Sequence, residues 1–200
     1  MKDWTGNKKS TYAAIGASNH SNQERQKDDF YATDPIAIDK LLMVEKPSKH
    51  IWECACGQGH LSERLKQHGY IVFSTDIRDR GYPETVLFDF LKAECPYNGF
   101  ECDILTNPPY KYAKEFVLKA LQLLRPGGNA YMFLKLTFLE GKKRYDDLFS
   151  KYPPKTVYVF IQRINCAMNG QFEKYHSSAV AYAWFVWQKG YTGTTEIKWI

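Results

Sequence analysis

The chain has 200 residues, of which 44% are hydrophobic and 16% aromatic, and it carries a formal net charge of +5. This length suits a single domain that buries a core of its own. The sequence pI of about 8.8 permits a polyanionic partner but is lower than the value above ~9 that is typical of a dedicated nucleic-acid-binding domain. No apolar run reaches the ~18 residues of a membrane span, and the polar N-terminus lacks the apolar stretch of a secretory signal, so we expect a cytoplasmic protein without a membrane partner.

The five cysteines are an odd number and form no CxxC pair, which argues against a disulfide framework and against a zinc site. We therefore expect no metal. Cys54 and Cys56 flank Ala55 at an apparent strand-to-loop junction, and we interpret them as small packing residues in a reducing compartment.

Residues 1–28 are rich in Ser, Asn, Lys and Gln and poor in large aliphatic residues, which predicts a flexible polar tail. Residues 29–200 are predicted to form a single domain. Asp34-Pro35 can begin a helix at the start of that domain. The apolar stripe of this helix consists of Ile36, Ile38, Leu41 and Leu42.

From residue 50 onward, short β-branched and aromatic runs alternate with helical patterns. Predicted strands cover residues 50–54, 71–75, 85–88, 102–106, 130–134, 156–161 and 179–187. Predicted helices cover residues 61–68 and 116–124. Strands that alternate with helices indicate an α/β domain with a doubly wound, mostly parallel sheet, and the two strands close together near the end indicate an antiparallel edge. We therefore expect a seven-stranded sheet with an antiparallel edge strand.

The carboxyl ends of parallel strands meet at one edge of the sheet, and ligands bind there, near the topological switch point. Three features of the sequence fall at that edge. They are the turn Gly57-Gln58-Gly59, called the glycine turn below, Asp76 after the second strand, and Asn107-Pro108-Pro109-Tyr110 after the fourth.

The glycine turn lets the backbone approach a ligand closely. It is not a dinucleotide fingerprint, because Ser62 stands where a third glycine or an alanine would be required. Glu53, just before the turn, would repel a pyrophosphate but attract a cation, and S-adenosylmethionine carries an ammonium and a sulfonium and no phosphate. Taken alone, the turn fits an ordinary strand-to-helix connection equally well.

Asp76 follows Gly57 by 19 residues and lies at the tip of a predicted strand. A carboxylate in this place can accept hydrogen bonds from both hydroxyls of a ribose. The alternative is a solvated loop carboxylate, of which Asp79 nearby is an example.

Asn107-Pro108-Pro109-Tyr110 is the most specific signal of the sequence. The two prolines fix φ and remove two N–H donors, so that the backbone carbonyls near them are held rigidly. The side-chain oxygen of Asn107 and the carbonyl of Pro108 can together accept both hydrogens of an –NH₂ group, and Tyr110 offers a ring for stacking. The alternative is a rigid turn after a strand.

With these residues, the chain resembles the class I amino-group methyltransferases, especially the N6-adenine DNA methyltransferases and their small phage or prophage members. The segments that resemble family motifs are Phe30–Pro35, Trp52–Gly59, Thr75–Ile77, Phe88–Phe90 and Asp103–Tyr110. The resemblance covers most of the chain and implies a Rossmann-like methyltransferase fold with S-adenosylmethionine as cofactor. The cofactor-binding residues that it implies are Tyr31, Thr33, Glu53, Cys54, Gly57, Gly59, Asp76, Ile77, Asp89, Phe90 and Asn107.

The same resemblance implies that Asn107, Pro108, Pro109 and Tyr110 are the catalytic residues. The expected reaction is methyl transfer to N6 of adenine in DNA, with the target base displaced from the duplex and stacked on Tyr110. The Asn-Pro-Pro-Tyr motif is less specific for the substrate than for the amino nitrogen. Cytosine N4, an RNA adenine and a protein glutamine therefore remain alternatives, as does a non-catalytic nucleic-acid-binding protein with this fold.

Larger members of the family carry a separate target-recognition domain, for which this chain has no room. Substrate contacts are therefore expected from the loops 140–154 and 163–178. In the first, Lys142, Lys143 and Arg144 can contact phosphates or form a solvated helix face. In the second, Phe172 can form the second wall of a base pocket. The sequence gives no oligomeric state.

Overall fold

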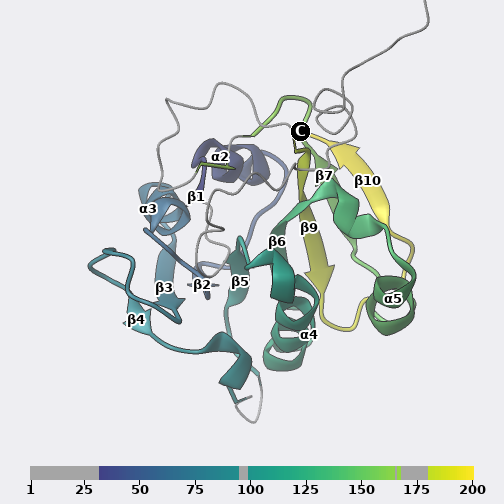
Figure 1. Cartoon of the computed structure of the whole chain (residues 1–200), viewed down its shortest axis with the longest axis horizontal. Coiled ribbons are helices and arrows are strands. Elements are labelled where there is room, and N and C mark those ends of the chain that lie inside the picture. Colours follow the sequence, from purple (N-terminus) through teal and green to yellow (C-terminus); the bar gives the residue numbers. More distant parts are fainter. Residues whose placement is uncertain (1–31, 95–98, 165, 168–179) are drawn as a thin grey trace, which may run out of the picture.

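The computed structural model describes residues 32–94, 99–164, 166–167 and 180–200. Its centre is an eight-stranded sheet with the strand order β10-β7-β9-β6-β5-β2-β3-β4 (Figure 1). The strands are β2 (His50–Glu53), β3 (Ile71–Asp76), β4 (Val86–Leu87), β5 (Asp103–Thr106), β6 (Asn129–Lys135), β7 (Thr156–Val159), β9 (Tyr182–Gln188) and β10 (Glu196–Trp199). Among the residues that the structure describes, no helix is long and apolar enough to span a membrane.

The expected α/β class and the mostly parallel sheet are confirmed, and two details of the sheet differ. Strand β9 is antiparallel to both β6 and β7, so the antiparallel strand lies inside the sheet and not at its edge. The edge is extended by an eighth strand, β10, which runs parallel to β7. All four residues of β10 are exposed, although its sequence Glu196–Trp199 alternates polar and apolar residues, a pattern that the prediction from the sequence did not use. Six of the seven residues of β9 are buried, as befits an internal strand.

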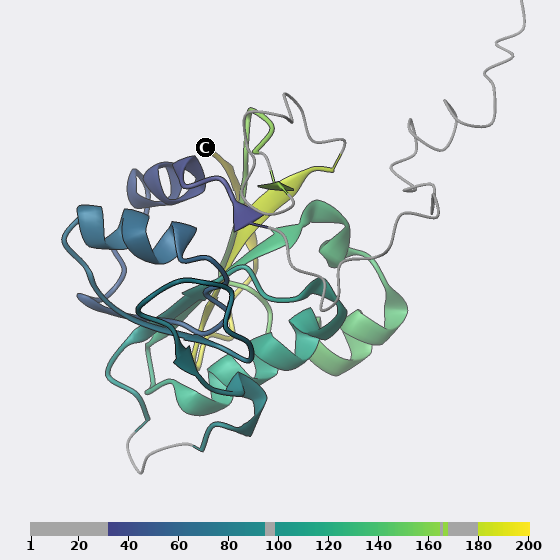
Figure 2. The same cartoon turned by 60° about the vertical axis from the view of Figure 1, so that its left-hand side comes forward.

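Helices cover the two faces of the sheet (Figure 2). Helices α2 (Ile36–Leu42) and α3 (His60–Gln67) lie on one face, and α4 (Ala113–Leu123) lies on the other. The short α5 (Lys142–Arg144) continues into a wider turn over Tyr145–Phe149. Short 3-10 turns, η1 (Phe90–Lys92), η2 (Tyr110–Tyr112) and η3 (Leu136–Leu139), follow β4, β5 and β6.

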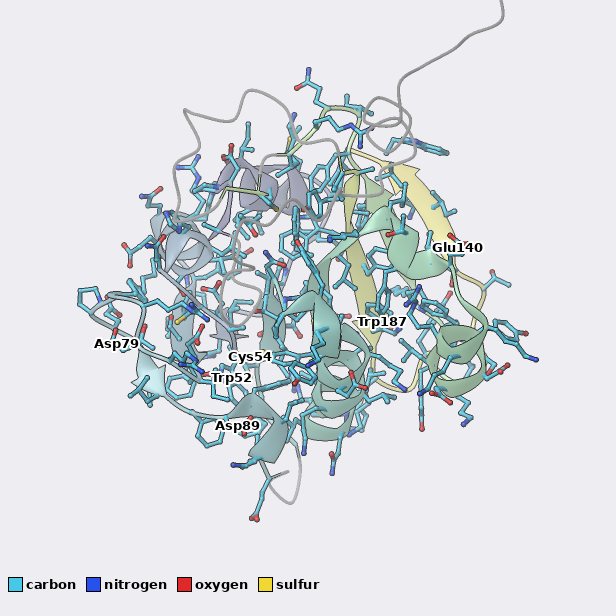
Figure 3. All side chains as sticks on the ribbon, in the orientation of Figure 1. Trp52, Cys54, Asp79, Asp89, Glu140 and Trp187 are labelled. Atoms are coloured by element: carbon cyan, nitrogen blue, oxygen red, sulfur yellow. The ribbon has the colours of Figure 1, made fainter. Side chains whose placement is uncertain are left out.

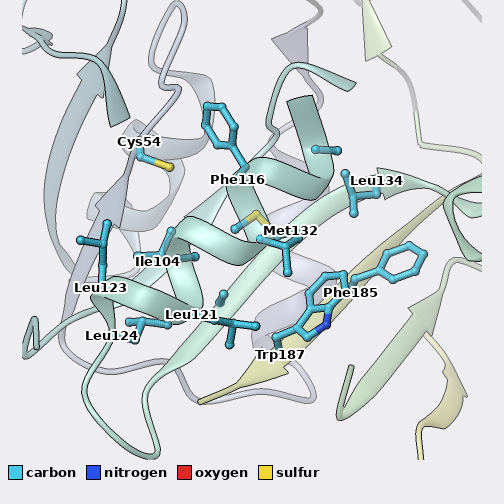
Figure 4. Close-up of a cluster of buried hydrophobic side chains, with 14 of the residues drawn as sticks. Cys54, Ile104, Phe116, Leu121, Leu123, Leu124, Met132, Leu134, Phe185 and Trp187 are labelled. Carbon is cyan, nitrogen blue, oxygen red and sulfur yellow. The ribbon is translucent and has the colours of Figure 1, made fainter. Parts of the chain in front are cut away.

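Successive strand residues point to opposite faces and build two separate cores. Under α2 and α3 lie Ile51, Leu105, Tyr131, Phe133 and Trp184, together with their neighbours. Under α4 lie Ile104, Met132, Phe185 and Trp187 (Figure 4). Trp52 belongs to the same core. Both faces of β5, β6 and β9 are therefore buried, which explains the nearly continuous apolar sequences of β6 and β9.

The chain passes from β2 outward to β3 and β4 and then returns to β5 on the other side of β2. The sheet therefore has its topological switch point between β2 and β5, where a ligand crevice forms at the carboxyl ends of the strands. A two-stranded antiparallel sheet, β1 (Ala32–Thr33) with β8 (Cys166–Ala167), also belongs to the structure.

Trp184 offers a direct test of this packing. Its side chain is fully buried, its indole N–H donates to the Ala37 carbonyl at 2.9 Å, and its ring meets Phe133 edge-on at 5.3 Å. We expect Trp184→Ala to lower the free energy of unfolding by about 3–5 kcal/mol in urea denaturation. Trp199→Ala on the exposed β10 is the control and should change it by no more than about 0.5 kcal/mol. Equal losses in both variants would contradict the assigned core.

Candidate functional site

The polar residues singled out in the sequence lie at the carboxyl ends of adjacent strands. Glu53 ends β2, Asp76 ends β3, and Asn107 follows directly on β5. Since β2 pairs in parallel with both β3 and β5, the structure brings these residues to one edge of the sheet, as expected.

Asp76 fastens the glycine turn to the end of β3. Its Oδ2 accepts the Gly57 N–H at 2.9 Å, and its Oδ1 accepts the Arg78 N–H at 3.0 Å. Arg80 Nε lies 3.7 Å from Oδ1. Asp76 is therefore no solvated loop residue but a buried carboxylate, 5% exposed, held beside the turn. Each of its oxygens retains capacity to accept a further hydrogen bond.

The position of Gly59 requires glycine because the side chain of Tyr82 packs directly against it. Its φ of +78° suits glycine, and a Cβ there would overlap the ring of Tyr82. The Tyr82 hydroxyl donates to Glu63 Oε1 at 2.6 Å and accepts from Lys66 Nζ at 2.7 Å. These bonds hold the segment between β3 and β4 against α3 and the glycine turn.

Glu53, at the end of β2 and before the glycine turn, is buried with 2% exposure, and Ser62 Oγ donates to it. Burial raises the pKa of Glu53 to about 8, because the ionised form loses its hydration. Burial likewise raises the pKa of the Cys54 and Cys56 thiols, that of Cys56 to about 12. Both thiols are therefore neutral near pH 7, which agrees with their interpretation as packing residues.

The remaining residues expected around the cofactor differ in exposure. Ile77 is 63% exposed just beyond β3, whereas Phe90 is buried against Trp52 and Phe116, with ring centroids 5.2 and 5.0 Å away. Asp89 caps the turn η1 by accepting the Leu91 N–H at 3.1 Å. Figure 3 shows Asp89 on the same side of the molecule as Trp52 and Cys54. Ile77 is thus open to solvent and Asp89 is half-buried, whereas Phe90 is part of the core.

The amide of Asn107 is oriented by Thr33. Asn107 Nδ2 donates to Thr33 Oγ1 at 2.8 Å, and Thr33 is itself placed by the pairing of β1 with β8. With the nitrogen facing Thr33, the side-chain oxygen faces the other way. The resemblance implies that Thr33 binds the cofactor. The sequence did not predict the hydrogen bond between Thr33 and Asn107.

The two prolines have different roles. The Pro109 carbonyl accepts the Tyr112 N–H at 2.8 Å and so starts the turn η2. The buried Pro108 is not used in this way: within the part of the chain that the structure describes, its carbonyl accepts no hydrogen bond. Its oxygen is therefore available to a ligand, next to the side chain of Asn107.

Tyr110 is surrounded by three residues that the sequence analysis did not select. Lys135 Nζ lies 4.7 Å from the centre of its ring, Tyr182 stacks at 6.1 Å, and Cys166 Sγ lies 4.0 Å from its hydroxyl. Burial raises the pKa of Tyr110 far above its usual range, so the phenol is neutral. Lys135 ends β6 and Tyr182 begins the antiparallel β9. The sequence signal that could have identified Lys135 and Tyr182 is their position at strand ends on the same edge of the sheet as Tyr110.

The predicted substrate contacts are only partly described. Lys143 and Arg144 line a hollow next to Tyr110, and Lys142 precedes them in α5. Tyr31, Phe172 and the tail 1–28 lie outside the described residues, as does most of the loop 163–178. A larger, mostly apolar hollow of about 390 Å³, which includes Ile51, Phe73 and Phe100, involves the amino-terminal halves of β2 and β3 and none of the residues predicted for the site.

No protein-family model and no curated protein matches the chain. Solved structures do match. A candidate RNA methyltransferase from Pyrococcus horikoshii superposes with a TM-score of 0.58 at 16% identity, over 90% of this chain and 98% of that one. A candidate class I S-adenosylmethionine-dependent methyltransferase from Listeria monocytogenes gives 0.55 at 14% identity, over 94% and 70%. The modification subunit of a candidate type I restriction enzyme from Vibrio vulnificus gives 0.54 at 14% identity, over 85% and 46%.

At such identities the likeness shows the fold. The chain has the mixed α/β, Rossmann-like fold of class I S-adenosylmethionine-dependent methyltransferases.

Proposed function

We propose that the protein transfers a methyl group from S-adenosylmethionine to the exocyclic N6 amino group of adenine in DNA. The observation that carries the proposal is the placement of Asn107 at the topological switch point, with its amide oriented by Thr33, on the strand next to the glycine turn. The resemblance of Asn107–Tyr110 to the catalytic motif of amino-group methyltransferases supports the same reaction.

The residues at the edge of the sheet fit S-adenosylmethionine. Asp76 would bind the ribose beside Gly57, Ile77 would pack on the adenine, and Asp89 would accept from its amino group. The carboxylate of Asp76 lies at the turn, and Glu53 adds a second negative charge when it is ionised, so the site suits a cationic ligand better than a phosphate. When bound, the cofactor supplies a methyl group on a sulfonium, which an amine nitrogen can accept.

The chain's own contribution is to position the amine. The side-chain oxygen of Asn107 and the carbonyl of Pro108 accept the two amino hydrogens, which draws the nitrogen from planar toward tetrahedral and makes its lone pair available. The prolines and Thr33 fix both oxygens before the substrate arrives, so little reorganisation is needed. The surplus proton leaves after transfer, and no strong general base is required.

A planar base would stack on Tyr110, since an amino nitrogen inside a duplex cannot be reached. Lys135 lies over this ring, so an entering base would share the ring with the ammonium or displace it. An adenine in RNA presents the same amino group, and the likeness to a candidate RNA methyltransferase makes RNA adenine the second candidate substrate.

The direct test incubates pure protein with methyl-labelled S-adenosylmethionine and unmethylated DNA, RNA or protein extract. Products are hydrolysed and identified by mass. We expect the label in N6-methyldeoxyadenosine. Label in N6-methyladenosine alone would move the substrate to RNA, and label in protein alone would overturn the nucleic-acid assignment. Failure to bind the cofactor in calorimetry would indicate a non-catalytic protein.

Cofactor affinity is expected to depend on pH through Glu53. Because its pKa is raised to about 8, the carboxyl is mostly protonated at pH 7 and becomes ionised as the pH passes 8. A cationic cofactor binds better beside the ionised form, so calorimetry should show affinity rising between pH 6.5 and 9. Glu53→Gln should abolish this rise.

The matched control is Glu63→Gln on α3. A hydrogen bond from Tyr82 lowers the pKa of Glu63, which therefore stays ionised over the whole range, and this variant should retain the rise. An unchanged pH dependence in Glu53→Gln would show that the ionisation of Glu53 does not affect cofactor affinity.

A further inference from the structure

Next to Tyr110 lies a hollow of about 240 Å³, called the basic hollow below, with four cationic side chains in its walls. Lys111 and Lys114 come from the segment after β5, and Lys143 and Arg144 come from α5. The ring of Tyr110 forms part of the same wall. The hollow therefore adjoins the residue on which the target base would stack.

The basic hollow lies on the far side of Asn107 from the cofactor residues. The glycine turn, Asp76 and Asp89 follow β2, β3 and β4, whereas the hollow is built from segments that follow β5 and β6. Figure 3 shows Glu140, which precedes α5, on the opposite side of the molecule from Asp79. Its cations are thus placed for the substrate and not for the cofactor.

Arg144 is held in a fixed orientation. Its Nε donates to the Phe138 carbonyl at 2.9 Å, and its Nη2 donates to the carbonyls of Thr137, at 3.3 Å, and Glu140. Gly141 permits this fold, since its φ is +126° and a Cβ there would come within 3.0 Å of Arg144 Nη2. Among the described residues, Nη1 has no hydrogen-bond partner, which leaves two donors of a positioned guanidinium for an anion.

The charge of the hollow is only partly balanced. Lys114 pairs with Asp147 at 2.7 Å and lies 4.0 Å from Glu115. Lys111 and Lys143 are exposed and form no ion pair within the described chain. Against two carboxylates stand four cations, so a net positive charge faces the space beside Tyr110.

We infer that the basic hollow binds a backbone phosphate of the strand that carries the target base. The ligand class is a phosphodiester. The Tyr110 ring and the cations line the same hollow, so a nucleotide whose base stacks on Tyr110 would bring its phosphate close to the cations. Arg144 would donate from Nη1, and Lys111 and Lys143 would neutralise the charge. This rests on the proposed function and adds to it the place where the backbone of the substrate strand binds.

The test compares Lys111→Ala/Lys143→Ala with a control pair, Lys40→Ala/Lys46→Ala, which removes equal charge around α2. Fluorescence anisotropy measures the affinity for an adenine-containing single-stranded DNA, and for RNA of the same sequence, between 50 and 200 mM salt. For one lost phosphate contact we expect Kd to rise about tenfold at low salt and the salt slope to fall by about 0.7. The control pair should leave the slope within error of the wild type.

Cofactor affinity is measured in parallel, and it should be unchanged in both pairs because the lysines lie away from the glycine turn. Binding requires no turnover, so the strand measurement stands even if no methyl transfer is found. Equal loss of DNA affinity in both pairs, or an unchanged slope in Lys111→Ala/Lys143→Ala, would overturn the inference. Tighter binding of an acidic peptide than of DNA would also overturn it, because the anion would then belong to a protein.

Discussion

Asn107→Ala is expected to lower kcat by about 10²- to 10³-fold while the affinity for S-adenosylmethionine changes by less than about twofold. The side-chain oxygen would contact the amine and not the bulk of the cofactor, so its loss removes positioning and polarisation of the nitrogen. Single-turnover methylation and calorimetry on the same preparation measure the two quantities separately.

Two further variants make this result specific. Thr33→Val removes the acceptor that orients the amide at 2.8 Å and should give an intermediate loss of kcat. Asn129→Ala at the amino end of β6 removes an equal side chain far from the edge and should leave kcat unchanged. Comparable losses of turnover and cofactor affinity in Asn107→Ala would contradict the role given to Asn107.

Tyr110→Ala should lower kcat/KM for an oligonucleotide, since stacking on an aromatic ring contributes about 1–3 kcal/mol per base, or about 5- to 150-fold. Tyr110→Phe should remain close to the wild type. The phenol is neutral, and its hydroxyl lies 4.0 Å from Cys166 Sγ, a contact that stacking does not need.

The comparison of these two variants separates the ring from the hydroxyl. Steady-state methylation of one oligonucleotide, at saturating cofactor, supplies both values. If Tyr110→Phe lost as much activity as Tyr110→Ala, the hydroxyl and not the ring would be the functional group.

Most of the sheet could be predicted from the sequence, because buried strands such as residues 130–134 are continuous apolar runs and shorter ones such as residues 102–106 have an apolar centre before turn residues. The mostly parallel arrangement followed from the alternation of strands with helices. The place of β9 did not follow, since its pairing with β6 and β7 depends on contacts between segments distant in the chain. Strand β10 is exposed throughout, and its polar–apolar alternation spans only four residues, too few to stand out from a loop.

The position of the candidate site was predictable where polar residues lie directly at strand ends, as at Asp76 and Asn107. It was not predictable where side chains from distant segments meet only in the fold. Thr33 and Asn107 are 74 residues apart in sequence, and Lys135 reaches Tyr110 from another strand. Local sequence patterns contain no information about such contacts.

The most direct test of the account is a crystal structure of the protein with S-adenosylhomocysteine and an adenine-containing oligonucleotide. We predict that the side-chain oxygen of Asn107 and the carbonyl oxygen of Pro108 both lie about 2.7–3.2 Å from N6 of an adenine that is displaced from its strand and stacked on Tyr110. An adenine whose N6 points away from these two oxygens, or a cofactor product bound elsewhere than at the glycine turn, would contradict the central claim.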